Sequence, residues 1–242
     1  STEVCIHKKA GKVSELPDSP GILQGTIGIG HTRWATHGIP SDIDAHPHQD
    51  CTDQIAVVHN GIIENYSALK RDLIGRGHIF RSDTDTEVIA HLIEEAYTGD
   101  LLEAVRNTLP LLSGSYALLI ISAGENRLIA ARNQSPLVLG IGDGEIFAAS
   151  DITPLLEYTS RVIYLNDGDT AELRPDSYSV YFGDRPAEHE IHEISWTPDT
   201  IQKGGFAHFM LKEIFEQPDA IHQAVHAVSE ETLPSSLLNA SS

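Results

Sequence analysis

The stretch that decides the fold is Ser115–Gly140, SYALLIISAGENRLIAARNQSPLVLG, in which short apolar runs alternate with turn residues. Ser115–Ser122, Arg127–Arg132 and Leu137–Gly140 are each typical of a strand, because Gly, Asn and Pro break the chain between them at hairpin spacing. Similar runs follow at Glu145–Ala149, Arg161–Leu165, Thr170–Leu173 and Tyr178–Phe182. Strands this close together, without long helices between them, predict antiparallel pairing.

Helices are predicted immediately upstream of these strands. Apolar residues at helical spacing indicate a helix over Tyr66–Leu73 and two more that end near Ala96 and Leu112. Thr84 and Glu87 have the spacing of a capping box, and Asp100 has the position of an N-cap for the last helix. Helices followed by a run of strands predict an α+β layered domain rather than a doubly wound one.

Composition excludes several classes of protein. The 242 residues carry 35 acidic and 16 basic side chains, a formal charge of −19 that would repel nucleic acid. No apolar run approaches the ~18 residues of a membrane helix, so no membrane span is predicted. Cys5 and Cys51 form neither a CxxC pair nor a disulfide framework. We therefore expect a cytoplasmic protein of one large domain.

A dense group of histidines lies in the first quarter of the chain. Its members are His31, His37, His46, His48 and His59. A metal site at His46 and His48, with Asp44, Asp50 and Cys51 nearby, is one interpretation, but an HxH pair alone is a weak signal. We expect structural histidines that hydrogen-bond to loop backbone, and the sequence predicts no metal ligand and no cofactor.

Three polar segments suggest a site for a free amino acid. His31–Gly38, HTRWATHG, lies at the end of a predicted strand over Thr26–Trp34 and offers Arg33 as a clamp for a carboxylate. The Asn60–Gly61 pair can be a plain turn, or it can present a side-chain amide and a backbone N–H as an oxyanion hole. Ser82–Glu87, SDTDTE, can cap a helix or hold an ammonium group.

These segments together resemble the class II, or N-terminal nucleophile, glutamine amidotransferases. Four motifs resemble those of the glutamine:fructose-6-phosphate aminotransferase (glucosamine-6-phosphate synthase) family. They are HTRWATHG at His31–Gly38, DAHPH at Asp44–His48, AVVHNGIIEN at Ala56–Asn65 and SDTDTEVIAHL at Ser82–Leu92. HFMLKEIFEQP at His208–Pro218 supports that family and disfavours the amidophosphoribosyl-transferring type.

The resemblance implies a four-layer αββα sandwich that hydrolyses glutamine to glutamate and ammonia. It assigns the glutamine α-carboxylate to Arg33 and the α-ammonium to Asp85, and it assigns the oxyanion hole to the Asn60 amide and the Gly61 N–H. Thr36 and His37 would shape the pocket, and Trp34 would close it. The ammonia would pass to a sugar-isomerase half, and the whole enzyme would be a homo-oligomer.

The resemblance also implies a missing nucleophile. In the family this group is a cysteine at the mature N-terminus, whereas Val4–Val13 here matches a strand and turn inside the domain, so Cys5 is not its counterpart. We expect residues 1–205 to be an amidotransferase domain without its first strand, inactive alone, and residues 206–242 to be a connector towards an absent isomerase half. The alternative is a non-catalytic glutamine-binding or regulatory module.

Overall fold

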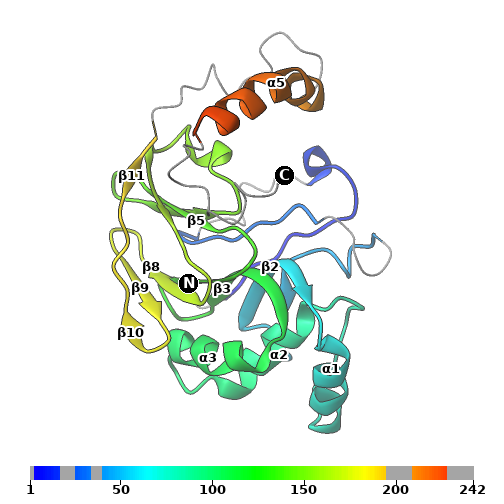
Figure 1. Cartoon of the computed structure of the whole chain (residues 1–242). Helices are drawn as coiled ribbons and strands as arrows, with labels where there is room; N and C mark the ends of the chain where they lie inside the picture. Colours follow the sequence, from blue (N-terminus) through cyan, green and yellow to red (C-terminus); the bar gives the residue numbers. More distant parts are fainter. Residues whose placement is uncertain (1–2, 17–24, 34–39, 195–208, 228–242) are drawn as a thin grey trace, which may run out of the picture. The chain divides into compact units, whose positions relative to one another are not determined.

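The computed structural model describes residues 3–16, 25–33, 40–194 and 209–227 (Figure 1). The chain divides into two compact units, residues 1–195 and residues 196–242. Helix α5 (Phe209–Ala227) is the described part of the second unit. The domain boundary predicted at residue 205 stays a prediction. None of the described helices has the length and apolar character that crossing a bilayer requires.

Two antiparallel sheets form the first unit. The larger has the strand order β1 (His48–Gln49), β2 (Ile55–Ile63), β3 (Gly114–Ser122), β4 (Leu128–Asn133), β8 (Asp169–Leu173), β9 (Tyr178–Phe182) and β10 (Arg185–Pro186). The smaller has the order β11 (His192–Glu193), β7 (Arg161–Tyr164), β5 (Val138–Ile141) and β6 (Ile146–Ala149). Every described strand pair is antiparallel, which confirms the pairing predicted from the hairpin spacing.

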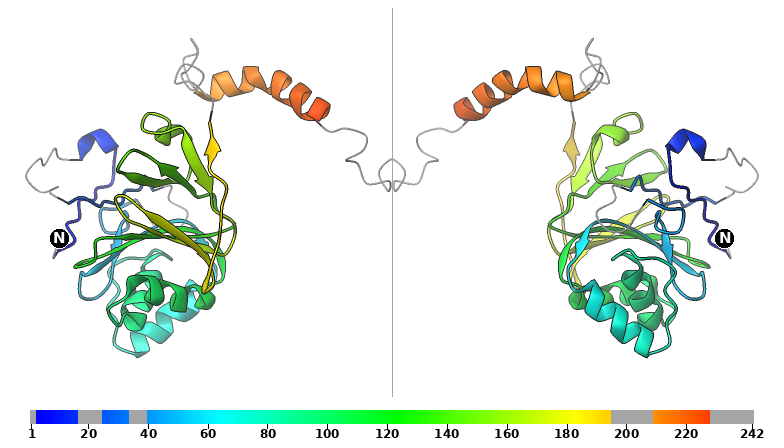
Figure 2. Two further views of the ribbon diagram at one scale, coloured as in Figure 1. Left: turned by 90° about the vertical axis from the view of Figure 1, so that its left-hand side faces the viewer. Right: turned by 90° about the vertical axis from the view of Figure 1, so that its right-hand side faces the viewer.

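The helices of this unit cover one face of the larger sheet, and the smaller sheet lies against the other face (Figures 1 and 2). They are α1 (Tyr66–Gly75), α2 (Glu87–Ala96) and α3 (Leu101–Thr108), with short 3-10 turns at Val13–Glu15, Leu109–Leu111 and Thr153–Leu155. Alternate residues of β3 face the two sides, because successive strand side chains point in opposite directions. Leu118 and Ile120 pack with the helices, and Ala117 packs with Leu139 and Ile163 of the smaller sheet. The predicted α+β sandwich with antiparallel sheets is therefore confirmed.

One of the two predicted helix caps is present. The Asp100 side chain accepts a hydrogen bond from the Glu103 backbone N–H, as its position at the start of α3 predicts. The prediction of a capping box formed by Thr84 and Glu87 is wrong, because helix α2 begins only at Glu87. The Glu87 carboxylate instead accepts from the backbone N–H groups of Arg81 and Ser82, both at 2.7 Å. It thereby orders the turn that precedes the helix.

The strand predicted over Thr26–Trp34 is also wrong for the part that the structure describes. Residues 25–33 contain no strand, and neither do residues 3–12. The N-terminal segment is held instead by side-chain bonds to the loop before β1: Lys8 Nζ donates to the carbonyl oxygens of Ile43 and Pro47, at 2.9 and 3.3 Å. Neither segment pairs with a described strand, so local alternation was not sufficient to place it in a sheet.

Candidate functional site

Asn60 lies in strand β2, between β1 and β3 of the larger sheet. The Asn-Gly pair does not make a tight turn: β2 continues to Ile63, and Asn60 and Gly61 stand opposite Ala117 and Tyr116 of β3. Asn60 lines a cavity of about 230 Å³ whose walls come from β2 and β3 on one side and from Ala148 and Ala149 of β6 on the other. The polar group predicted for an oxyanion hole therefore opens onto a space large enough for a small ligand.

His31 orients the Asn60 amide. Its Nε2 atom lies 3.3 Å from Asn60 Oδ1. In the tautomer with the proton on Nε2, the ring donates to the amide oxygen and leaves the amide N–H bonds for another acceptor. His31 was grouped with the structural histidines in the sequence, and its contact with Asn60 makes it a positioning residue for this site.

Gly61 occupies a position that no other residue can take without rearrangement. Its φ is +136°, and a Cβ atom built there would lie 2.1 Å from the carbonyl oxygen of Ser115 and 3.0 Å from His59 Nε2. Because the obstructing oxygen belongs to the backbone of the neighbouring strand, the clash cannot be relieved by a side-chain rotation. The close approach of β2 and β3 at this point thus depends on glycine.

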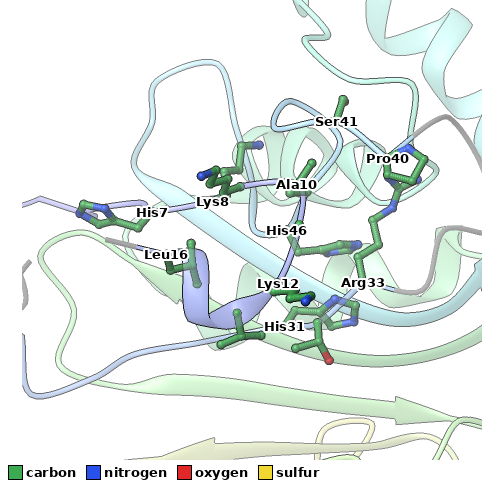
Figure 3. Close-up of a pocket in the computed structure, with 15 residues that line it drawn as sticks. His7, Lys8, Ala10, Lys12, Leu16, His31, Arg33, Pro40, Ser41 and His46 are labelled. Atoms are coloured by element: carbon green, nitrogen blue, oxygen red, sulfur yellow. The ribbon is translucent and has the colours of Figure 1, made fainter. Parts of the chain in front are cut away.

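Arg33 lines a second cavity, of about 250 Å³, with His31, His46 and the segment His7–Val13. Figure 3 shows the side chains of His31, His46 and Arg33 gathered at one end of it. Lys8, Lys9 and Lys12 also line this cavity, so its wall is rich in cationic groups suited to a carboxylate. His31 and Thr32 line both cavities, which places Arg33 and Asn60 on the two sides of one short segment.

Asp85 lies close to the end of β2 but lines neither cavity. Its side chain is buried, and its Oδ2 accepts a hydrogen bond of 2.8 Å from the backbone N–H of Ile63, two residues beyond Gly61. The structure thus brings Asp85 to the strand that carries Asn60 and Gly61. Trp34, Thr36 and His37 fall within residues 34–39, which lie outside the described residues, and their predicted roles stay predictions.

The histidines beside this site are neutral. Burial lowers the pKa values of His31, His46 and His59, and it lowers the pKa of His48 to about 4. The rings of His31 and His46 lie 4.2 Å apart, so protonating them would place like charges in contact. The prediction that these histidines hydrogen-bond to loop backbone is wrong for His48, whose ring bonds to the Thr84 hydroxyl. His59 bonds both to the Thr86 hydroxyl and to the backbone carbonyl of Ser115.

This neutrality predicts a loss of stability in acid. The folded-state pKa of His48, about 4, lies below the unfolded value near 6.5, so the unfolded chain binds the extra proton first. The free energy of unfolding is therefore retained above pH 6.5 and falls as pH drops towards 4, by about 1 to 2 kcal/mol between pH 7 and 5 for this residue. Urea unfolding at both pH values gives the measurement. The drop in unfolding free energy from pH 7 to pH 5 should be about 1 to 2 kcal/mol smaller in the His48→Gln variant than in the wild type.

The exposed His192 supplies the control for that measurement. His192→Gln should retain the wild-type difference in unfolding free energy between pH 7 and 5. An equal change in both variants, or none in His48→Gln, would contradict a buried neutral His48.

Comparison with known proteins agrees with this fold. Two solved structures share the architecture at TM-scores of 0.52 and 0.54: a glutamine phosphoribosylpyrophosphate amidotransferase from B. subtilis in complex with ADP and GMP, and an allosteric regulatory enzyme of purine biosynthesis. They are 27% and 28% identical to this chain, and each comparison covers 64% of this chain and 34% of the other. The α+β sandwich is thus that of the N-terminal nucleophile amidotransferases.

The sequence comparisons define the family more narrowly. Residues 31–157 match the glutamine amidotransferase domain family, and the chain belongs to that family. A glutamine–fructose-6-phosphate aminotransferase (isomerizing) of Thermococcus kodakarensis is 55% identical over 93% of this chain and 38% of its own length. The protein of the same name from Aquifex aeolicus is 49% identical over 96% of this chain and 40% of its own length. The chain thus spans about two fifths of the length of these relatives.

Proposed function

We propose that this chain is the glutamine-hydrolysing part of a glutamine:fructose-6-phosphate aminotransferase. The observation that carries the proposal is the placement of Asn60: its amide opens onto the cavity between the sheets, is oriented by His31, and is followed by a glycine whose strand contact excludes a side chain. An amide donor beside a closely packed backbone is the arrangement that stabilises the oxyanion of an acyl-transfer reaction.

The remaining roles follow the chemistry of a free amino acid. Arg33 pairs with the α-carboxylate of glutamine, and the cationic wall around it attracts that group. Asp85 pairs with the α-ammonium group; its carboxylate is held near the end of β2 by the Ile63 N–H. Trp34 closes the pocket, and Thr36 and His37 shape it.

The reaction is an acyl transfer to sulfur followed by hydrolysis. A thiolate attacks the side-chain amide carbon of glutamine, and the carbonyl oxygen becomes an anion that accepts from the Asn60 amide and the Gly61 N–H. As this intermediate collapses, the proton taken from the thiol passes to the departing nitrogen, the C–N bond breaks and ammonia leaves a glutamyl thioester. Water then hydrolyses the thioester to glutamate and regenerates the thiol. The family resemblance assigns the attack to an N-terminal cysteine. Neither Cys5 nor Cys51 lines the cavity beside Asn60, so neither is proposed for this role.

The wider assignment rests on the named relatives. Their name supports the amination of fructose 6-phosphate as the use of the ammonia released here. The sugar-isomerase half as the partner that receives the ammonia, and assembly as a homo-oligomer, remain predictions. The cytoplasm as the site of action likewise remains a prediction.

The experiment is to measure glutamate release from glutamine by the purified chain and by a form extended at its N-terminus so that it begins with a cysteine. We expect turnover in the extended form and none in the chain as given. Glutamine binding by calorimetry without turnover in either form would favour a glutamine-binding or regulatory module instead. Turnover by the chain as given would overturn the assignment of the nucleophile.

A further inference from the structure

A second group of chemically active side chains lies apart from the residues assigned to glutamine. Cys51 is in the turn between β1 and β2, His78 follows α1, and His91 and Glu94 are on α2. One atom from each, namely the sulfur, the two Nδ1 nitrogens and a carboxylate oxygen, lies within 4.8 Å of the other three. Three segments that are distant in the sequence therefore direct ligand-type atoms at a single point.

Five of the six distances among these atoms are close to those of a tetrahedral metal site. Cys51 Sγ lies 3.5 Å from Nδ1 of both histidines, and the two Nδ1 atoms lie 3.2 Å apart. Glu94 Oε2 lies 3.1 Å from His78 Nδ1 and 3.3 Å from His91 Nδ1. Zinc bonds of about 2.0 to 2.3 Å in tetrahedral geometry require ligand–ligand distances of roughly 3.3 to 3.6 Å.

The outer contacts of the two histidines point to a cation rather than to hydrogen bonds alone. His78 Nε2 lies 3.0 Å from Glu95 Oε1, and His91 Nε2 lies 3.6 Å from Glu87 Oε1. A carboxylate facing Nε2 favours the tautomer with the proton on that atom, which leaves the Nδ1 lone pair free. Two such lone pairs 3.2 Å apart repel each other unless a positive ion lies between them.

We propose that Cys51, His78, His91 and Glu94 bind one zinc ion. Nitrogen and sulfur ligands in tetrahedral array select zinc over magnesium or calcium, and the thiolate and carboxylate together balance its charge of two. Four protein ligands leave no open position for substrate, so the site is structural. The bound ion links helix α2 to two other segments, the β1–β2 turn and the connection between α1 and α2. This inference does not depend on the glutaminase assignment, because none of the four ligands belongs to the glutamine site.

The test uses the purified chain, stripped with a chelator and titrated with zinc alone. We expect one equivalent of bound zinc and a higher melting temperature on its addition. Cys51→Ser should lose the binding and the shift, whereas Cys5→Ser, which changes the exposed cysteine, should retain both. Glu95→Gln removes an outer partner and should weaken zinc affinity about 10- to 100-fold.

Cobalt gives a readout that does not depend on a variant. Co²⁺ added to the stripped wild-type chain should produce the absorption of a tetrahedral site with a thiolate-to-cobalt charge-transfer band, and this band should be absent in Cys51→Ser. If Cys51→Ser does not fold, the wild-type cobalt spectrum and the zinc affinity of Glu95→Gln decide the matter. Absence of stoichiometric zinc, full zinc binding by folded Cys51→Ser, or a cobalt spectrum without the thiolate band would each overturn the proposal.

Discussion

Asn60→Ala in the cysteine-bearing enzyme is expected to lower kcat for glutamine hydrolysis about 100- to 1000-fold, a loss of roughly 3 to 4 kcal/mol of transition-state stabilisation. The amide N–H bonds that His31 leaves available would donate to the oxygen only as it becomes an anion. KM for glutamine should change much less than kcat, since the ground-state carbonyl gains little from this donor. Steady-state glutamate release over a range of glutamine concentrations gives both constants.

The control is an asparagine of similar exposure outside the site. Asn107 is exposed on α3, and Asn107→Ala should leave kcat and KM at wild-type values. A loss of less than tenfold in kcat for Asn60→Ala, with normal folding by circular dichroism, would refute its role in an oxyanion hole.

Gly61→Ala is expected to lower the free energy of unfolding by roughly 3 kcal/mol or more. The new methyl group would meet the Ser115 carbonyl oxygen at 2.1 Å, in a backbone conformation with φ of +136° that an alanine rarely adopts. Relief requires β2 and β3 to separate at this point, because the obstructing oxygen belongs to the backbone of β3. Gly114 repeats the arrangement from the other strand, with φ of +117° and a Cβ position 2.1 Å from the Ile62 carbonyl oxygen, so Gly114→Ala should show a loss of the same order.

Denaturant unfolding of these variants should be compared with Gly75→Ala. Gly75 is the last residue of α1, and nothing lies within 4 Å of its Cβ position. Alanine there should be neutral or stabilise the chain by up to about 1 kcal/mol, because it favours the helix. If Gly61→Ala unfolds at the same denaturant concentration as Gly75→Ala, the close strand contact does not govern stability at this position.

Local patterns in the sequence were sufficient for the strands from Ser115 onward and for one helix cap. The hairpin-spaced runs from Ser115 to Phe182 became the antiparallel strands β3 to β9, since alternation and turn residues act within a few positions. The Asp100 cap was equally local: its acceptor meets a backbone donor three residues later. Arg33 and Asn60 could be proposed as site residues because side-chain chemistry and motif spacing are visible without coordinates, and their roles stay predictions.

The tertiary structure alone decided the features that join distant segments. Thr84 has the local spacing of a cap, but its hydroxyl contacts His48, 36 positions away, while Glu87 orders the turn before the helix. Cys51 was noticed only beside His46 and His48, yet its partners His78 and His91 lie 27 and 40 positions along the chain. Sequence patterns report the conformation of neighbouring residues. A group of side chains assembled from the β1–β2 turn, the α1–α2 connection and helix α2 depends instead on how the packed layers bring remote atoms together.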